Sequence, residues 1–372
     1  MNNNFPYFKT KSLETDFANA RFLKRKYLPS LRKTLPLHYL ITQDHRKYLA
    51  FIKKHSTKYP YFLCFDIEKY FPNINHQILL KELASNYEKL THKPLSRNFQ
   101  KLLKKDIPLF LQQSPLKNHS LALGNPLSHV LAGLYLLKLD FSFKTPLLRF
   151  CDDYLVFVKT ERDLKRILSE TTHVLETLDL GLNINKLQSG KFHRNKCKFL
   201  GFQFYAGHTT ITEQKIEDFK KRIIRTTHLT NKKPVPAVIK LLNNQILGFG
   251  HYYKFADCRN VFKDLDSFIR FRLRRYILRN RNLLPKTSNL LLTNQALKEM
   301  NLKSLTAIKQ RFDEKSGLKN KKIKKRVNKT GSFHSKTIWL ETEQISNRYL
   351  LKQILIKLNE LSSSVKKLEK RL

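Results

Sequence analysis

The chain has 372 residues, 41% of them hydrophobic, and its 72 Lys and Arg against 29 Asp and Glu give a formal net charge of +43. This length allows two or three domains with a sizeable core. The positive excess goes beyond what solubility requires and predicts a polyanionic partner, most simply the phosphates of a nucleic acid. An anionic membrane surface is the second choice.

Other features exclude several classes of protein. The four cysteines are scattered and form no C-x-x-C pair, so neither a zinc site nor a disulfide framework is indicated, and a reducing cytoplasm fits. The N-terminus lacks the apolar core of a signal peptide. The longest mostly uncharged run, around residues 121–139, contains Asn, Pro, Ser and His, so we reject it as a membrane span and expect no membrane partner.

The first strand predicted along the chain ends in an acidic residue. Residues 1 to about 60 are predicted to be mostly helical, with basic residues interleaved with aromatics. The apolar run 61–65 then ends in Asp66, which predicts a buried strand that delivers a carboxylate at its C-terminal end. Residues 75–118 have apolar positions at helical spacing. Gly124, Asn125 and Pro126 break the chain before a predicted helix over residues 128–140.

Two adjacent acids, Asp152 and Asp153, lie between short apolar runs that favour strands, which predicts a β-hairpin with the aspartates at its tip. For two acids alone, a solvated turn is an equal alternative. Crowded carboxylates repel one another and favour a divalent cation, and together with Asp66 they make an oxygen-ligand site suited to Mg²⁺. Two such ions can activate a 3′-hydroxyl and stabilise a leaving pyrophosphate.

The second half of the chain is predicted to be largely helical. Residues 161–180 form an amphipathic helix that Gly181 ends as a C-cap. Helices follow over about 212–312, and a basic linker follows them. Leucine, isoleucine and valine then recur three and four residues apart from Leu351 to Leu372, as in a coiled-coil seam. This seam predicts a homo-oligomer or a partner protein, with packing on the body of the protein as the alternative.

Several of these segments resemble reverse transcriptases of the bacterial, group II intron-like kind. FDIEKYFPNI (65–74) resembles the first palm motif, and FCDDYLVF (150–157) resembles the Y-x-D-D motif with Phe150 in place of Tyr. LALGNPLSHVLAGLYLLKLD (121–140) resembles the motif between them, with Leu123 and His129 where the family commonly has Gln and Pro. LGLNIN and KFLGFQF (198–204) resemble the two motifs that close the palm. Residues 246–280 resemble the group II thumb, with Gly248, Tyr252 and Tyr253 matching its pattern.

The resemblance implies an α+β right-hand polymerase with reduced fingers, a palm with an antiparallel sheet, a helical thumb and a basic helical C-terminal extension. The expected domains are fingers at 1–60, palm at 61–210, thumb at 211–312, a basic linker at 313–340 and a heptad helix at 341–372. The catalytic residues that it implies are Asp66, Asp152 and Asp153. These three residues and Ile67 are the implied site for two Mg²⁺ ions, for which Mn²⁺ is a possible substitute.

The resemblance also implies contacts with the nucleotide and with the primer–template. The nucleotide residues are Phe71, Gly124, Asn125 and Lys186, and the primer and template residues are Ser128, Phe150, Cys151, Leu200, Gly201, Arg270 and Arg274. Phe71 is expected to exclude a 2′-hydroxyl by steric contact, with a role as a core aromatic as the alternative. Lys186 is the expected proton donor to pyrophosphate, and Lys191 competes for that role.

The leading functional hypothesis is an RNA-directed DNA polymerase that copies an RNA template by adding dNTPs to a DNA primer. The template can be a noncoding RNA. The shortened fingers and the altered motif at 121–140 favour a role in bacterial defence against phage, in the manner of abortive-infection reverse transcriptases. A group II intron maturase or retroelement enzyme is the alternative. A template-independent polymerase and a catalytically idle RNA-binding scaffold are further alternatives, and the three acids argue against the scaffold because buried carboxylates without a function are costly.

Overall fold

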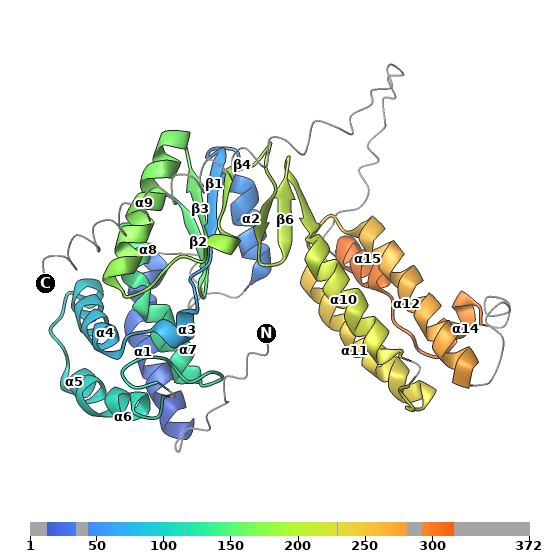
Figure 1. The fold of residues 1–372 in the computed structure, drawn as a ribbon, viewed down its shortest axis with the longest axis horizontal. Helices are drawn as coiled ribbons and strands as arrows, with labels where there is room; N and C mark the ends of the chain where they lie inside the picture. The colour runs from blue at the N-terminus through green and yellow to red at the C-terminus, as the bar shows by residue number, and fades with distance from the viewer. Residues whose placement is uncertain (1–12, 35–43, 115, 229, 281–291, 316–372) are drawn as a thin grey trace, which may run out of the picture. The chain divides into compact units, whose positions relative to one another are not determined.

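The computed structural model describes residues 13–34, 44–114, 116–228, 230–280 and 292–315, which all belong to one compact unit spanning Met1–Gly317 (Figure 1). The predicted heptad helix and nearly all of the predicted linker lie outside the described residues. Within the described part of the chain, no helix is long and apolar enough to cross a membrane.

Two antiparallel sheets form the middle of the fold. The larger sheet has the strand order β2-β3-β1-β4, and its strands are β1 (Tyr61–Phe65), β2 (Leu147–Phe150), β3 (Asp153–Val158) and β4 (Gln188–Lys191). The smaller sheet has the order β5-β6-β7, and its strands are β5 (Cys197–Phe199), β6 (Phe202–Tyr205) and β7 (His208–Ile211). The apolar runs on either side of the aspartate pair are therefore strands β2 and β3, as the sequence predicts.

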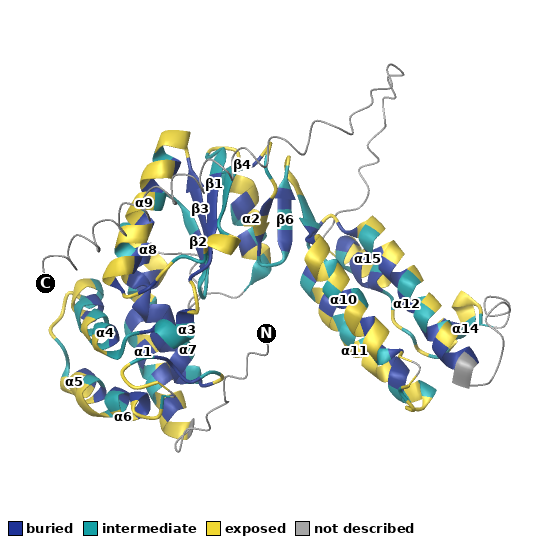
Figure 2. Ribbon diagram, viewed as in Figure 1, coloured by how far each residue is buried: buried dark blue, intermediate teal, exposed yellow. Residues whose placement is uncertain are grey.

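The two central strands of the larger sheet, β1 and β3, are buried on both faces, which explains why β1 reads as an unbroken apolar run (Figure 2). Side chains of a strand alternate between faces. Leu63 and Phe65 accordingly pack into one core cluster, while Phe62 and Cys64 pack into the other. The first cluster contains residues of the palm helices, and the second contains residues of β5–β7 and of the C-terminal helices. Strand β1 therefore joins the two cores.

The described residues before the sheet are largely helical, as predicted, and form α1 (Leu13–Thr34) and α2 (His45–His55). Helix α1 lies against α4 and α7. The Tyr27 hydroxyl on α1 donates to the backbone oxygen of Leu83 on α4 at 2.6 Å. Helix α2 begins at the N-cap Asp44, and its buried residues Tyr48 and Ile52 pack in the second cluster.

Short helices fill the chain between β1 and β2. They are α3 (Tyr70–Asn73), α4 (His76–Thr91), α5 (Arg97–Lys101), a π-helical turn (Leu102–Asp106), α6 (Ile107–Leu111), α7 (Pro126–Tyr135) and α8 (Leu137–Ser142). The single helix expected over 128–140 is therefore wrong. The helix breaks at Leu136, which has φ −86° and ψ 3°, so the segment forms two helices, α7 and α8.

Helix α9 (Glu161–Thr177) matches the amphipathic pattern predicted for this segment. Its predicted end is wrong, because Gly181 is not the capping residue. The helix is capped at Leu178, and Asp179 takes the left-handed conformation with φ +56°. Aspartate tolerates this conformation better than most residues, so the chain turns two residues earlier than the glycine indicates.

The C-terminal described region is helical, with α10 (Glu213–Thr226), α11 (Val235–Tyr253), α12 (Arg259–Asn280), α14 (Asn294–Glu299) and α15 (Leu305–Lys315). Helix α15 runs three residues past the expected end of the thumb. It packs on α11 so closely that a Cβ on Gly250 would lie 2.6 Å from Cδ1 of Ile308. The Asp266 carboxylate on α12 accepts hydrogen bonds from the first backbone amides of α15, Leu305 and Thr306. The mixed fold with an antiparallel sheet and a helical C-terminal region confirms the predicted fold class.

Candidate active site

The aspartate pair lies at the end of the β2–β3 hairpin. Phe150 pairs with Asp153, which leaves Cys151 and Asp152 as a two-residue loop, and Asp153 is the first residue of β3. Cys151, the first residue of this loop, has φ +57°. The two turn types that favour such hairpins both need a positive φ at this position. A two-residue loop therefore places both aspartates at one end of the sheet.

Asp66 directly follows β1 and reaches the same end of the sheet. In the antiparallel register Phe65 pairs with Tyr154, so the next position on each strand brings Asp66 opposite Asp153. The Asp66 residue is only 6% exposed. The structure thus brings together the three acids that the sequence singles out, although they are spread over more than 80 positions of the chain.

Burial and neighbouring charges raise the pKa of two of these carboxylates, Asp152 and Asp153. Burial, followed by the neighbouring charges of Asp152 and Asp66, raises the pKa of Asp153 to about 7. Burial also raises the pKa of Asp152, with the Asp66 charge as the second cause. Near neutral pH the cluster therefore lacks the positive charge that would keep all its carboxylates ionised.

Lys186 supplies part of that charge. Its Nζ lies 2.8 Å from Oδ2 of Asp66, to which the Asn183 side chain also donates at 3.2 Å. This hydrogen bond raises the pKa of Lys186. The chain holds both residues at Asp66 through a backbone bond from Asn183 to Asp66 and a bridge between Ile67 and Leu182. The competing Lys191 lies on β4 with its ammonium over the Tyr61 ring, at the other end of β1.

The donor set suits a hard divalent cation. Among the residues that the structure describes, no group of three His, Cys, Asp or Glu side chains is arranged to hold a metal ion. One oxygen of Asp66 faces Lys186. Nevertheless, carboxylate oxygens are the ligands that Mg²⁺ and Mn²⁺ take, and the raised pKa values show a site that a cation would stabilise.

Phe71 lies on α3, five residues beyond Asp66, and is partly buried. Its backbone oxygen accepts from Leu121, and its ring meets the His129 ring of α7 edge to face at 5.6 Å. Burial lowers the pKa of His129, and the charge of Lys24 on α1 lowers it further, so this histidine is neutral at pH 7. The structure therefore places Phe71 beside the segment that resembles the intervening motif.

The polar residues of that segment point inward. Asn125 is 2% exposed, and its side chain both accepts from the amide of Leu127, capping α7, and donates to Asp16 at 2.8 Å. Ser128 is fully buried. Gly124, just before them, is exposed and has φ +82°. In this arrangement Asn125 caps α7 and ties it to Asp16 on α1, Ser128 is enclosed, and Gly124 is the exposed residue of the three.

A second two-residue hairpin loop joins β5 and β6, where Phe199 pairs with Phe202. Leu200 and Gly201 both have positive φ, at +50° and +77°. The Tyr252 hydroxyl of α11 donates to the backbone oxygen of Leu200 at 3.0 Å. A Cβ on Gly201 would lie 2.5 Å from the hydroxyl oxygen of Tyr253, so only glycine fits there. The segment expected to grip the primer is therefore held by the two tyrosines of the thumb pattern.

The arginines of α12 divide between internal and exposed positions. Arg274 donates to the backbone oxygen of Leu292 at 2.7 Å and to Asn294 at 2.8 Å, and Arg272 donates to Thr227. Arg270 is partly exposed, and Phe271 is 53% exposed. The predicted contact of Arg274 with nucleic acid therefore competes with its bonds inside the helical region.

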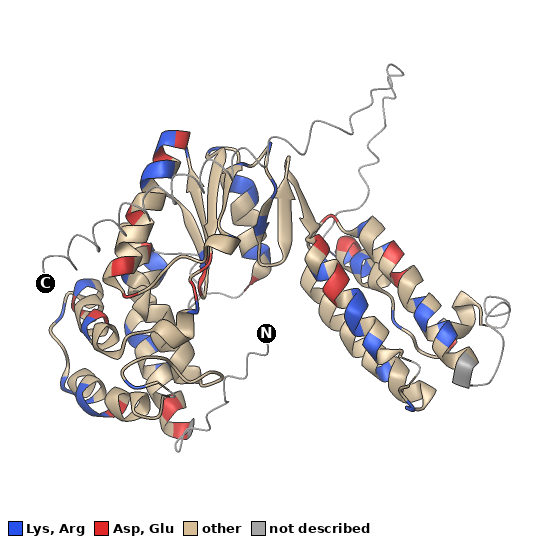
Figure 3. Cartoon of the chain, in the orientation of Figure 1, with Lys and Arg blue, Asp and Glu red and all other residues tan. Residues whose placement is uncertain are grey.

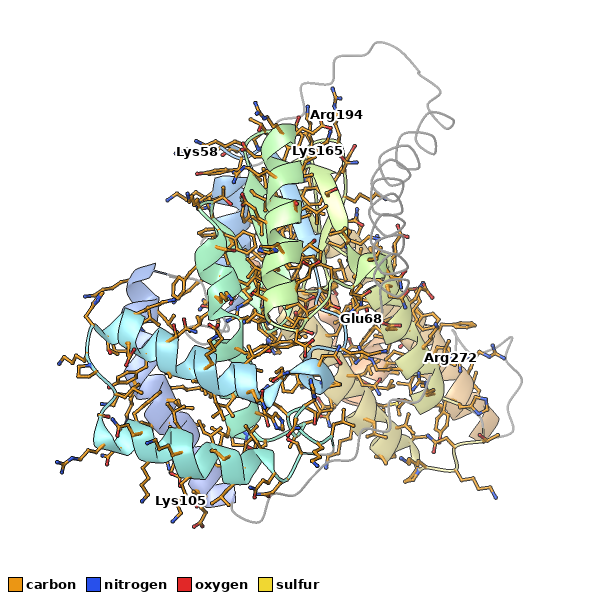
Figure 4. All side chains as sticks on the ribbon, turned by 60° about the vertical axis from the view of Figure 1, so that its left-hand side comes forward. Lys58, Glu68, Lys105, Lys165, Arg194 and Arg272 are labelled. Atoms are coloured by element: carbon orange, nitrogen blue, oxygen red, sulfur yellow. The ribbon has the colours of Figure 1, made fainter. Side chains whose placement is uncertain are left out.

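Basic side chains spread over the described surface and outnumber the acidic ones (Figure 3). Arg97, Lys101, Lys104 and Lys105 are exposed along α5 and the π-helical turn. Figure 4 shows Lys105 pointing away from its helix. Such a surface attracts the phosphates of a nucleic acid.

Two sequence-family comparisons match this arrangement. Residues 18–204, half of the chain, match the model of the family described as reverse transcriptase (RNA-dependent DNA polymerase), and this span includes the three acids. The chain belongs to the reverse transcriptase family. Residues 216–291 match the group II intron maturase-specific domain, which covers α10 to α12, so this reverse transcriptase is of the group II intron-like kind that the motifs resemble.

The comparison with solved structures finds similar chains among telomerases. A telomerase from Candida albicans, solved with a fragment of telomeric RNA, has 12% identity and a TM-score of 0.40, over 76% of this chain and 57% of that one. The apo telomerase from Candida tropicalis has 16% identity and a TM-score of 0.42, over 80% of this chain and 59% of that one. The reverse transcriptase chain thus spans less than two thirds of these relatives. No curated protein matches it.

Two buried charged residues beside the hairpin were missed in the sequence analysis. Arg149 and Asp140 form an ion pair with both side chains fully buried. Arg149 is the single charged residue of the apolar run LLRF, and that pattern is a signal that could have identified it, because buried charges need partners. Asp140 has no such signal, because Lys138 lies two residues before it in LYLLKLDF.

Proposed function

We propose that this protein is an RNA-directed DNA polymerase that extends the 3′-hydroxyl of a primer with dNTPs. The observation that carries the proposal is the meeting of Asp66 with Asp152 and Asp153 at one end of the sheet, in a chain whose first half matches reverse transcriptases. Asp66 and Asp152 are the proposed direct ligands of two divalent ions, Mg²⁺ with Mn²⁺ as a substitute, and Asp153 adds charge. Bound there, the ions would supply Lewis-acid activation of the hydroxyl and the phosphates.

The chain's own side chains have separate tasks in this proposal. Lys186, held at Asp66, donates a proton from Nζ to the leaving pyrophosphate. Phe71 excludes a 2′-hydroxyl and so selects deoxynucleotides. The exposed Gly124 allows close approach of the nucleotide. Leu200 and Gly201, braced by Tyr252, contact the primer strand.

The proposed partners are an RNA template, a DNA primer and product, and dNTPs. With a net charge of +43, RNA affinity should fall steeply as the salt concentration rises. The predicted coiled-coil seam at the C-terminus adds self-association or a partner protein, and the scattered cysteines favour the cytoplasm. These statements remain predictions from the sequence.

For the cellular role, defence against phage is our first proposal, on the ground of the altered motif with Leu123 and His129. Maturation or mobility of a group II intron is the second, and the match of residues 216–291 to the maturase-specific domain favours it. The RNA that the protein carries and the phage resistance of its host distinguish the two roles. Enrichment of a group II intron RNA supports maturation, whereas loss of phage resistance in the Asp152→Asn variant supports defence.

The experiment that tests the activity uses protein purified with the nucleic acid it carries. Labelled dNTPs and Mg²⁺ are added, and both the bound RNA and the product are sequenced. A product complementary to a bound RNA establishes templated reverse transcription. A repetitive product with no complement indicates template-independent synthesis, and RNA binding without any product in Mg²⁺ or Mn²⁺ supports the idle scaffold and contradicts the proposal.

A further inference from the structure

The ion pair between Arg149 and Asp140 is the most deeply buried charge in the described part of the palm. Nη2 of Arg149, on β2, lies 3.0 Å from Oδ2 of Asp140, on α8, and neither side chain is exposed. Burial alone would lower the pKa of Arg149, but the Asp140 carboxylate raises it, so the guanidinium stays charged. Removing two charges from water is costly, and apolar residues of similar volume often replace such a pair without loss of stability. Stability alone therefore does not explain the pair.

The arginine reaches the loop that carries the aspartates. Nη1 of Arg149 donates to the backbone oxygen of Cys151 at 3.2 Å, and Nη2 donates to the backbone oxygen of Gly133 on α7 at 2.6 Å. Cys151 has a positive φ, which is unfavourable for a residue with a side chain. The planar guanidinium thus connects α7 to the one loop residue whose backbone conformation needs support.

The Asp140 side chain contacts β3, the strand that pairs with β1 next to Asp66. Oδ1 of Asp140 accepts from the hydroxyl of Tyr154 at 2.8 Å. The Tyr154 ring is fully buried and stacks on the Phe65 ring, with centroids 4.7 Å apart and the ring planes 7° apart. Phe65 precedes Asp66, and Tyr154 follows Asp153. One buried pair therefore contacts both acid-bearing segments, the loop through Cys151 and β1 through Tyr154.

We infer that Arg149 and Asp140 are positioning residues for the three catalytic carboxylates: the pair fixes the loop with Asp152 and Asp153 against the end of β1 with Asp66, and so sets the spacing in which the carboxylates bind divalent ions. The inference rests on the proposed function. It assigns no contact with substrate to either residue, because both are buried.

The decisive variant replaces the pair by apolar residues, Arg149→Met with Asp140→Leu, which fills the space without charge. Arg149→Lys is the second variant, since it keeps the charge but loses the planar fork. The matched control is Arg166→Met, which breaks an exposed pair with Glu170 at 2.8 Å on α9. Each protein is measured for thermal unfolding, RNA binding, Mn²⁺ binding by electron paramagnetic resonance, and single-turnover primer extension.

We expect the double variant to unfold cooperatively and bind RNA as the wild type does. Its Mn²⁺ affinity and its single-turnover rate should each fall about 10–100-fold, as for residues that orient metal ligands. The KM for dNTP should stay within about twofold, because the lost interaction acts on the reacting groups and not on nucleotide binding. Arg149→Lys should show the same losses, and Arg166→Met should show none.

A folded double variant with wild-type Mn²⁺ affinity and rate would overturn the inference. If the double variant fails to fold, Arg149→Lys and Tyr154→Phe, which removes only the hydroxyl bound to Asp140, decide in its place: weaker Mn²⁺ binding in these folded variants supports the inference, and unchanged binding refutes it. If the wild type binds Mn²⁺ but extends no primer, the proposed function fails, while the Mn²⁺ comparison still tests the positioning role.

Discussion

The β2–β3 and β5–β6 hairpins both turn through two residues, but different parts of the chain hold them. The loop with Asp152 is held from within the palm, where Arg149 donates to the Cys151 backbone. The loop of Leu200 and Gly201 is held from the C-terminal helical region, where Tyr252 donates to the Leu200 backbone. We propose that the first arrangement sets the spacing of the three carboxylates. The second joins a surface expected to contact the primer to helices expected to form the thumb.

Removing the acids should have the largest effect on activity. Asp152→Asn with Asp153→Asn removes ligands whose metal ions supply several kcal/mol of transition-state stabilisation, so we expect extension to fall by at least about 1,000-fold. The unfolding temperature should stay equal or rise, because two partly buried, mutually repelling carboxylates are gone. Primer-extension rates and calorimetry measure both. The control, Asp264→Asn on the exposed face of α12, should change neither, and an active double variant would contradict this assignment.

Breaking the buried pair on one side only should have the largest effect on stability. Asp140→Ala leaves the Arg149 guanidinium buried without its main counter-charge, and we expect a loss of about 3–5 kcal/mol in the free energy of unfolding. Urea denaturation measures this loss. Glu170→Ala, at an exposed pair, should cost no more than about 0.5 kcal/mol. Equal costs for the two variants would show that the buried pair contributes no more than a surface pair.

Gly201 and Gly207 allow a matched test of the second hairpin. Both have positive φ, +77° and +81°, but a Cβ on Gly207 meets nothing within 4 Å. Gly207→Ala should therefore cost only the backbone strain of about 1–2 kcal/mol. Gly201→Ala should cost about 1–3 kcal/mol more, because the added methyl overlaps the Tyr253 hydroxyl. The unfolding free energies of the two variants measure this difference. Adding Tyr253→Phe should restore part of the lost stability in the Gly201→Ala variant and none in the Gly207→Ala variant.

Removing a single hydroxyl from the second hairpin should have a smaller effect. Tyr252→Phe loses the 3.0 Å hydrogen bond to Leu200, and we expect about 1 kcal/mol of destabilisation. Because the bond joins the hairpin to α11, the number of nucleotides added per binding event should fall while the rate of the first addition stays unchanged. A gel of products under single-encounter conditions shows both quantities, and a slower first addition would place Tyr252 in the chemical step instead.

The pH dependence of stability, which reports on the acid cluster, should be the smallest of these effects. The pKa of Asp153 is raised to about 7 in the folded protein, above its ordinary value, so between those two values the folded state holds a proton that the unfolded state has released. Without divalent ions, stability should fall as the pH rises through this range and then level off above about pH 7. Melting temperatures across pH 4–8 measure this trend. Asp153→Asn should flatten it, and Mn²⁺ should stabilise the wild type more at pH 8 than at pH 6.

The local patterns of the sequence were sufficient to predict the acid-bearing elements. The strand that precedes Asp66 and the hairpin at Asp152 each depend on a few neighbouring residues, and the structure contains both. These patterns identify elements because apolar runs and turn residues act over short distances.

The parts that the sequence analysis missed depend on contacts between distant residues. Asn125, expected at the nucleotide, is buried against Asp16, 109 positions away. The Arg149–Asp140 pair likewise joins two elements that no local pattern connects. Tertiary contacts, not propensity, decide both cases.

The most direct test of the account is primer extension on a defined RNA template with a DNA primer, comparing the wild type with Asp152→Asn plus Asp153→Asn in Mg²⁺ and in Mn²⁺. We predict a DNA product that is complementary to the template from the wild type, and no product from the variant while both proteins bind the RNA. A product that persists in the variant, or an RNA-bound wild type that extends nothing with either ion, would contradict the claim that the three carboxylates catalyse DNA synthesis.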